Sequence, residues 1–246
     1  MKNLIIDIGN SAIKVCTGNS FSLSVQDVLR NPYSGNEFEK AAKLVLTNYI
    51  KGKSFSRIGI SVLNNDKKEF LKDFFSKVTK TKPEFINRDF DLPFKIRYKE
   101  GLGNDRICSI AGALGIFNKS SILVIDFGTA TTFTLMVNKI LTSGVISPGI
   151  NTSLKSLIQN TDLPNISMKF PAKIFNKNTI DNIRSGILYQ SMFTTEAFIK
   201  EARSNHPGIF VAATGGLSDF IIKKTELIDK TDKDLVLKGI NFILQK

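Results

Sequence analysis

Two short segments with the same order of residue types stand 119 positions apart in this chain of 246 residues. Residues 4–9 and 123–128 are each apolar up to an aspartate, Asp7 or Asp126, and each ends in a glycine followed by small hydroxyl or amide residues. A carboxylate can hold Mg²⁺, often through water. A glycine lets the backbone approach a ligand closely, and the N–H groups of a turn bind phosphate oxygens. The pattern therefore predicts that both halves of the chain contact the phosphates and metal of a nucleotide.

The alternative for either segment alone is an ordinary β-turn that happens to contain Asp and Gly. Their repetition favours phosphate binding, with two hairpins facing each other so that a nucleoside triphosphate is held between two lobes. Two other phosphate signatures are incomplete. Residues 101–106 have Arg106 where G-x-G-x-x-G needs its third glycine, and residues 112–120 lack the glycine that precedes the lysine of a P-loop. The nucleotide prediction therefore depends on the paired hairpins.

The elements that must position these segments alternate along the chain. Strands are expected at residues 4–7, 12–16, 57–63, 84–86, 95–98, 122–126, 131–137, 140–146 and 209–213. Helices are expected at residues 37–50, 67–78, 105–117, 152–159, 179–203, 217–223 and 232–244. We therefore expect an α/β protein of two duplicated lobes, residues 1–118 and 119–246, with mixed sheets flanked by helices.

Composition narrows the class of protein. The net charge of +12 comes from lysines scattered among acids, without a stripe of Arg and aromatic residues, so no nucleic-acid partner is expected. No apolar run is long enough to span a membrane. The chain starts directly with a strand pattern, so we expect no signal peptide.

Cys16 and Cys108 stand in apolar surroundings and are expected to be buried free thiols in a reducing cytoplasm. With His206 as the one histidine, no Cys/His metal cluster is expected.

Further segments complete a resemblance to a known family. Paired Asp-x-Gly hairpins in duplicated lobes resemble the actin-like (ribonuclease H-like) ATPase superfamily, which includes acetate and sugar kinases. Four more segments match family motifs: Gly103-Asn104-Asp105-Arg106 (G-x-D-R), residues 126–132 (D-x-G-T-A-x-T), residues 143–149 (G-G-x-I-x-P-G, with Ser143 for the first glycine) and Thr214-Gly215-Gly216 (T-G-G). Together with the opening D-x-G-N-S, this ordered set resembles type III pantothenate kinase.

The resemblance implies ATP-dependent phosphorylation of pantothenate to 4′-phosphopantothenate, the first step of coenzyme A biosynthesis. It makes Asp105 the general base that accepts the proton of the substrate hydroxyl. Arg106 would hold the substrate carboxylate in a bidentate fork. The alternative for this pair is an Asp-Arg sequence that stabilises the start of a helix. The implied pantothenate-binding residues are Tyr98, Gly103, Asn104, Asp105, Arg106 and Thr179.

For ATP, the resemblance implies contacts from the first hairpin, from Thr129 and from a T-G-G loop that receives adenosine. The implied ATP-binding residues are Asp7, Ile8, Gly9, Asn10, Ser11, Ala12, Ile13, Lys14, Thr129, Gly215 and Gly216. Asp7 would hold Mg²⁺ through water, and Asp126 would hold a monovalent cation, K⁺ or NH₄⁺. The alternatives are a strand-to-helix turn at Gly215-Gly216 and a helix N-cap at Thr179.

The family resemblance also implies a homodimer with substrate near the interface. The segment 180–199 has apolar residues on more than one helical face, which indicates burial on most sides. A partner subunit would provide that cover; the alternative is a central helix between the two lobes. Two rival functions remain open, a kinase of another small hydroxylated substrate and a non-catalytic transcriptional accessory protein of the same fold.

Overall fold

The computed structural model describes residues 2–164 and 166–246, and the chain divides into two compact units. The first unit comprises Met1–Ser120, Asn138–Thr142 and Asp234–Lys246. The second unit comprises Ser121–Val137 and Ser143–Lys233. The C-terminal segment thus belongs to the first unit. The lobes expected from the sequence were two continuous ranges, with this segment in the second.

The first unit is built on a five-stranded mixed sheet with the strand order β3-β2-β1-β4-β5. The strands are β1 (Lys2–Ile8), β2 (Ala12–Asn19), β3 (Val25–Pro32), β4 (Ile58–Val62) and β5 (Pro83–Phe85). The β1–β2 hairpin is antiparallel, and β4 runs parallel to β1 on its other side. Residues 3–8 of β1 are buried, as expected for a central strand covered on both faces.

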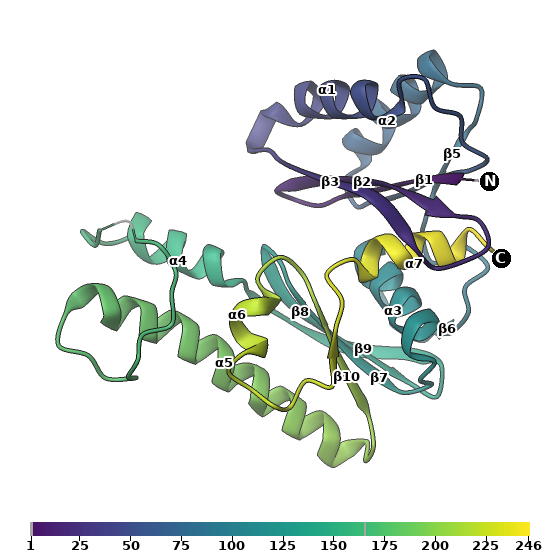
Figure 1. Cartoon of the computed structure of the whole chain (residues 1–246). Helices are drawn as coiled ribbons and strands as arrows, with labels where there is room; N and C mark the ends of the chain where they lie inside the picture. The colour runs from purple at the N-terminus through teal and green to yellow at the C-terminus, as the bar shows by residue number, and fades with distance from the viewer. Residues whose placement is uncertain (1, 165) are drawn as a thin grey trace. The chain divides into compact units, whose positions relative to one another are not determined.

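Helices cover both faces of this sheet (Figure 1). On one face lie α1 (Phe38–Ile50), preceded by the short helix η1 (Gly35–Glu37), and α2 (Asn65–Val78). Their apolar residues form one core with alternate residues of β1, because every second strand side chain points to the same face. On the other face, α3 (Asn104–Phe117) packs against α7 (Leu235–Ile243).

Glycines let α3 and α7 approach each other at backbone distance. A Cβ at Gly112 would overlap the carbonyl oxygen of Leu235, and a Cβ at Gly239 would overlap that of Cys108. Cys16 and Cys108 are free and buried, as predicted. Burial raises the pKa of both thiols, so they stay protonated and act as small core side chains.

The second unit repeats the same local topology. Its strands are β7 (Ile122–Phe127), β8 (Ala130–Val137), β9 (Ile140–Pro148), β10 (Phe210–Thr214) and β11 (Lys230–Thr231), in the order β11-β10-β7-β8-β9. The β7–β8 hairpin is antiparallel and β10 runs parallel to β7, as β4 does to β1. The first residues of β9 belong to the first unit, where they pair with β6 (Lys95–Ile96). The duplication seen in the sequence is therefore a duplication of strand topology.

The helices of the second unit are α4 (Ile150–Gln159), α5 (Thr179–Asn205) and α6 (Ser218–Ile222). The core of this unit joins alternate residues of β7, namely Leu123, Ile125 and Phe127, to the buried side of α5. The two mixed sheets flanked by helices confirm the predicted fold class. Strand β3 is absent from the sequence prediction, because its exposed polar residues give no apolar alternation. Among the described residues, no helix is long and apolar enough to cross a membrane.

Candidate active site

The first hairpin places a carboxylate and an ammonium group side by side. Asp7 and Lys14 are directly opposite each other in the β1–β2 register, so their side chains share one face of the hairpin. Lys14 Nζ donates to Asp7 Oδ2 at 2.9 Å. The turn between them is closed by a hydrogen bond from the Gly9 amide to the Ala12 carbonyl at 3.0 Å. Asp7 is buried and Lys14 is partly exposed, so the charge pair borders the solvent.

The G-x-D-R residues form the beginning of α3. Gly103 is the N-cap, and a Cβ at this position would overlap Asp105 Oδ1, so the glycine makes room for the Asp105 carboxylate. Asn104 Nδ2 donates to the Val62 carbonyl at 2.7 Å, which ties the start of α3 to the end of β4. The side chain of Asn104 is therefore engaged in anchoring the motif. Asp105 Oδ1 accepts a hydrogen bond from the Arg106 amide at 2.9 Å.

Asp105 is electrostatically coupled to the first hairpin. Desolvation by burial raises the pKa of the Asp105 carboxyl, and the nearby Asp7 carboxylate raises it further. The hydrogen bond from the Arg106 amide and the positive charges of Arg106 and Lys14 oppose this rise in the pKa of Asp105 without cancelling it. Two neighbouring carboxylates in different environments are a common arrangement for acid–base chemistry, because the raised pKa suits a proton acceptor.

Arg106 and Tyr98 lie together, as the resemblance implied for two substrate-binding residues. The Arg106 guanidinium carbon is 4.9 Å from the centroid of the Tyr98 ring, within cation–π range. Arg106 Nη1 donates weakly to the Tyr98 hydroxyl at 3.4 Å. Arg106 is only 4% exposed. A planar cation held against an aromatic face is restricted in orientation, which suits bidentate recognition of a carboxylate.

In the second unit, the T-G-G loop lies against the second hairpin. Asp126 is the β-ladder partner of Thr214, and the Leu217 amide donates to the Phe127 carbonyl at 3.3 Å. Gly215 has φ +94° and a Cβ there would overlap Asp126 Oδ1, so only glycine allows this approach. The structure therefore brings Asp126 and Gly215 together.

The Ser147-Pro148-Gly149 segment packs on the turn of the same hairpin. The Gly149 amide donates to the Thr129 carbonyl at 3.1 Å, and the Thr152 hydroxyl donates to the same oxygen at 2.6 Å. A Cβ at Gly149 would lie too close to the carbonyl groups of Gly128 and Thr129. These contacts fix the backbone at Thr129, whose side chain is exposed to solvent. Three motifs predicted from the sequence thus form one cluster in this unit.

Thr179, a predicted pantothenate contact, lies in the second unit apart from these three motifs. It is exposed at the start of α5, and among the described residues no hydrogen bond or ion pair links it to the three motifs. The alternative that Thr179 is the helix N-cap is wrong. Asn178 occupies that position, and its Oδ1 accepts from the Asp181 amide at 2.9 Å.

Comparisons with known proteins show the family of this chain. A sequence model of the type III pantothenate kinase family matches residues 3–201. The chain belongs to this family. The type III pantothenate kinase of Agathobacter rectalis is 37% identical over 150 residues, which cover 59% of this chain and 57% of that protein. The aligned segment thus spans little more than half the length of this curated relative.

Solved structures with low sequence identity share the fold. A protein of Campylobacter jejuni described as a Baf family transcriptional activator is 23% identical, with a TM-score of 0.63 over 98% of this chain and 96% of that one. The ROK family glucokinase of Streptomyces griseus, solved with glucose and AMPPNP, is 12% identical. Its TM-score is 0.54, with 98% of each chain covered. These likenesses support the two-lobed α/β fold predicted for this family member.

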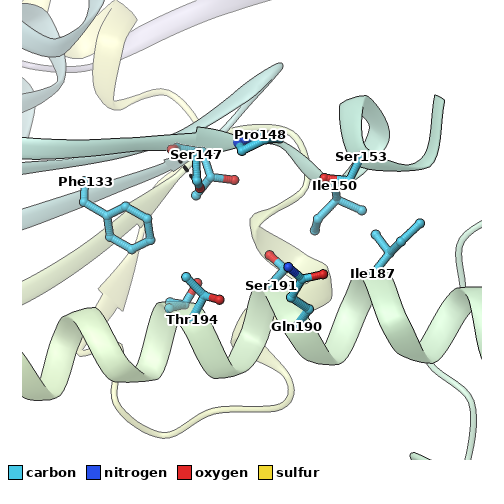
Figure 2. Close-up of a pocket in the computed structure, with 11 residues that line it drawn as sticks. Phe133, Ser147, Pro148, Ile150, Ser153, Ile187, Gln190, Ser191 and Thr194 are labelled. Atoms are coloured by element: carbon cyan, nitrogen blue, oxygen red, sulfur yellow. Dashed lines mark hydrogen bonds between the residues drawn. The ribbon is translucent and has the colours of Figure 1, made fainter. Parts of the chain in front are cut away.

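The structure also contains a cavity that the family motifs did not predict. It has a volume of about 140 Å³ and lies in the second unit between the strands β8 and β9 and the helix α5 (Figure 2). Ser147 and Pro148 border it on the strand side, and Gln190, Ser191 and Thr194 border it on α5. Its lining is neutral. The signal in the sequence is the polar stripe on α5, which stands among the apolar residues that dominate the pattern of this helix.

The donor chemistry of the first unit fits a hydrated Mg²⁺ ion. Mg²⁺ keeps several waters and uses one or two carboxylates together with substrate phosphates. Asp7, buried at the end of β1 beside the hairpin turn, supplies one such carboxylate. Among the described residues, no cluster of three or more His, Cys, Asp or Glu forms a complete metal cage, so phosphate oxygens would have to complete the coordination.

Proposed function

We propose that this chain transfers the γ-phosphoryl group of ATP to the primary hydroxyl of pantothenate. The observation that carries this proposal is the cluster of Asp7, Lys14, Asp105, Arg106 and Tyr98 in the first unit of a family member. The cluster combines a candidate metal carboxylate, a phosphate-binding cation, a proton acceptor with a raised pKa and an oriented guanidinium group. These are the parts that phosphoryl transfer to a hydroxylated carboxylic acid requires.

In the proposed reaction, Asp105 orients the pantothenate hydroxyl and accepts its proton as the hydroxyl oxygen bonds to the γ-phosphorus. The bond from the γ-phosphorus to the bridging oxygen breaks, and ADP leaves with that oxygen. Arg106 binds the substrate carboxylate, and Tyr98 keeps the guanidinium plane in place. Asp7 would hold Mg²⁺, which would supply positive charge to the phosphates. Thr179 is proposed as a further pantothenate contact.

We propose that each hairpin carries residues that contact nucleotide. Amides of residues 8–13 and the Lys14 ammonium would bind phosphate oxygens, and the Thr129 hydroxyl would add a donor. The backbone at Gly215-Gly216 would receive the adenosine. We propose that the reaction takes place in the cytoplasm, where ATP and reduced thiols coexist.

A direct assay tests the proposed function. Purified protein is incubated with Mg-ATP, K⁺ and pantothenate, and the products are identified by mass. We expect equal amounts of ADP and 4′-phosphopantothenate. ATP turnover that ignores pantothenate, or turnover of another hydroxylated acceptor in its place, would contradict the assignment. A protein that binds no nucleotide would favour the regulatory alternative.

We propose that Asp126 holds a monovalent cation beside the second hairpin. Its half-buried carboxylate touches the glycine loop, where a weakly hydrated cation would balance its charge against nucleotide phosphates. Activity should therefore require K⁺ or NH₄⁺ in addition to Mg²⁺, and Asp126→Asn should lose the response to K⁺. Steady-state rates in buffers that differ only in the cation test this, and full activity in Na⁺ alone would refute it.

A further inference from the structure

One buried tyrosine makes two hydrogen bonds to the turn of the first hairpin. The Tyr33 hydroxyl donates to the carbonyl of Gly9, and the Tyr33 amide donates to the carbonyl of Ser11 at 3.1 Å. Tyr33 follows strand β3 directly and is only 8% exposed. A single residue outside the hairpin thus binds the carbonyl groups on both sides of the turn residue Asn10.

These two bonds determine where neighbouring amides point. In a trans peptide the C=O and N–H groups point in opposite directions. Binding the Gly9 carbonyl to Tyr33 therefore turns the Asn10 amide away from Tyr33. Binding the Ser11 carbonyl does the same for the Ala12 amide. The bonds also keep two carbonyl oxygens from turning toward an anion, which they would repel.

A lysine donates a hydrogen bond to the hydroxyl of the same tyrosine. Lys67 Nζ lies 2.6 Å from the Tyr33 hydroxyl oxygen. An ammonium group has only donors and a carbonyl can only accept, so the hydroxyl accepts from Lys67 and gives its own proton to the Gly9 carbonyl. The ammonium also lies 5.1 Å from the centroid of the Phe38 ring, in cation–π range.

The position of Lys67 is unfavourable for the helix that carries it. Lys67 lies in the first turn of α2, where the Asn64 side chain caps its amide at 3.0 Å. The helix macrodipole favours acidic residues in a first turn and disfavours cations. Its contacts with Tyr33 and Phe38 offset this cost and connect α2 to the hairpin turn.

We propose that Tyr33, supported by Lys67, is a positioning residue that directs the Asn10 and Ala12 amides toward the nucleotide phosphates. This inference rests on the proposed nucleotide site, but it concerns residues outside the family motifs. Tyr33 would strengthen nucleotide binding by preorganisation, because the amides need not be reoriented when the phosphates bind. Tyr33 itself contacts no substrate.

The chain offers a closely matched control for the experiment. Tyr49 is also 8% exposed, and its hydroxyl donates to a backbone carbonyl, that of Asp27, at 3.0 Å. Lys53 Nζ lies 4.1 Å from the centroid of its ring. Tyr33→Phe and Tyr49→Phe each remove one hydroxyl that bonds to the backbone of the first unit, but only Tyr33→Phe releases a carbonyl of the turn, that of Gly9. The bond from the amide of residue 33 to the Ser11 carbonyl is kept in this variant.

The experiment measures binding of the β,γ-imido analogue of ATP with Mg²⁺ by calorimetry. We expect Tyr33→Phe to weaken binding about threefold to tenfold, the range for one lost hydrogen bond. Tyr49→Phe should change it less than about twofold by the same reasoning. Lys67→Met should weaken binding in the same direction, and Lys67→Arg, which keeps a donor and a charge, should restore most of it. In steady state, Tyr33→Phe should raise the KM for ATP and leave that for pantothenate unchanged.

The outcomes separate this inference from the proposed function. Unchanged analogue binding in Tyr33→Phe, or an equal loss in Tyr49→Phe, would overturn the positioning role and leave the kinase assignment intact. Weaker analogue binding in Tyr33→Phe would support it even if pantothenate proved to be the wrong acceptor. A wild-type protein that does not bind the analogue would refute the nucleotide site, and with it both proposals.

Discussion

Asp105 combines a chemical advantage with a cost to folding. Burial and the Asp7 carboxylate raise its pKa, so its ionised form is a stronger proton acceptor than an ordinary aspartate. The same environment makes that ionised form less favourable in the folded protein than in the unfolded chain. Active sites often keep such a cost because the reaction needs it. Catalysis and stability should therefore respond in opposite directions to one substitution.

The catalytic half of this expectation concerns the turnover number. Asp105→Asn should lower kcat by roughly 10²-fold or more, the usual size for loss of a positioned base. Binding of Mg²⁺ and the imido analogue of ATP should survive, because Asp105 lies outside both hairpins. Steady-state kinetics and calorimetry measure the two effects, and near wild-type kcat would remove Asp105 from the role of base.

The stability half concerns the pH dependence of unfolding. A carboxyl whose pKa is raised by folding carries no penalty below the unfolded pKa of about 3.9, because both states are then protonated. The penalty grows as the pH rises through the folded pKa and is complete above it. Asp105→Asn should therefore have a higher Tm than the wild type at pH 7, with a difference that shrinks toward pH 4. A lower Tm at neutral pH would show that the carboxylate stabilises the fold.

At the scale of elements, the candidate site is made of turns that pack closely on other turns. Gly215 lets the strand β10 end against Asp126, and Gly149 lets β9 end against the turn at Thr129. In the first unit, Gly103 makes room for the Asp105 carboxylate at the start of α3. These motif glycines are therefore required by packing between elements, in addition to any contact with a ligand.

Substitutions at the two adjacent glycines of this loop should differ in their effect on stability. Gly215→Ala should lower the free energy of unfolding by about 1–3 kcal/mol, because alanine at φ +94° is strained and its Cβ meets Asp126 and Phe127. A Cβ at Gly216 would meet no atom within 4 Å, and its φ is not positive, so Gly216→Ala should stay within about 0.5 kcal/mol of wild type. Urea unfolding of both variants is the measurement, and equal stability losses would argue against the close approach at Gly215.

At the scale of the whole molecule, the structure corrects our reason for expecting a dimer. Ile183, Ile187, Leu188 and Met192 of α5 are buried in the core of the second unit, so this helix does not by itself require a partner. Apolar residues do remain exposed on this unit. Ile146 is 61%, Phe175 92% and Phe193 48% exposed, with Ile174 and Ile180 also exposed. These exposed side chains are the ones that a partner subunit could cover, and the homodimer remains our proposal.

Replacing two of these exposed phenylalanines should separate the proposed dimer. Phe175→Ser with Phe193→Ser should shift the light-scattering mass toward one chain, since a symmetric interface loses each contact twice. If substrate binds near the interface, the KM for pantothenate should rise more than the KM for ATP. Phe21→Ser is the control, because Phe21 is 82% exposed on the first unit. A wild-type protein that is monomeric and fully active would rule out the requirement for a dimer.

Local sequence determined the two hairpins and the motifs they carry. Strand alternation, Asp-x-Gly turns and helix start signals act over a few residues, so the hairpins at Asp7 and Asp126 could be predicted from the chain alone. The helix expected from Asp105 begins one residue earlier, at Asn104. The resemblance named Tyr98 and Arg106 as substrate-binding residues, whereas their contact with each other was found in the structure. The repeat implied a strand, a tight turn and a returning strand in each half, and the structure added the parallel neighbours β4 and β10.

Tertiary structure alone decided the contacts between distant segments. Tyr33 reaches Gly9 across 24 residues, and Lys67 reaches Tyr33 across 34. The C-terminal helix α7 returns to pack on α3, and Gln190 and Ser191 of α5 line a cavity with Ser147. The polar stripe on α5 is visible in the sequence, but no local pattern identifies the distant partner of any of these residues. A buried tyrosine, for example, reads the same whether its hydroxyl binds the Gly9 carbonyl or another group. Their partners are set by how strands and helices stack, which depends on burial summed over a whole unit.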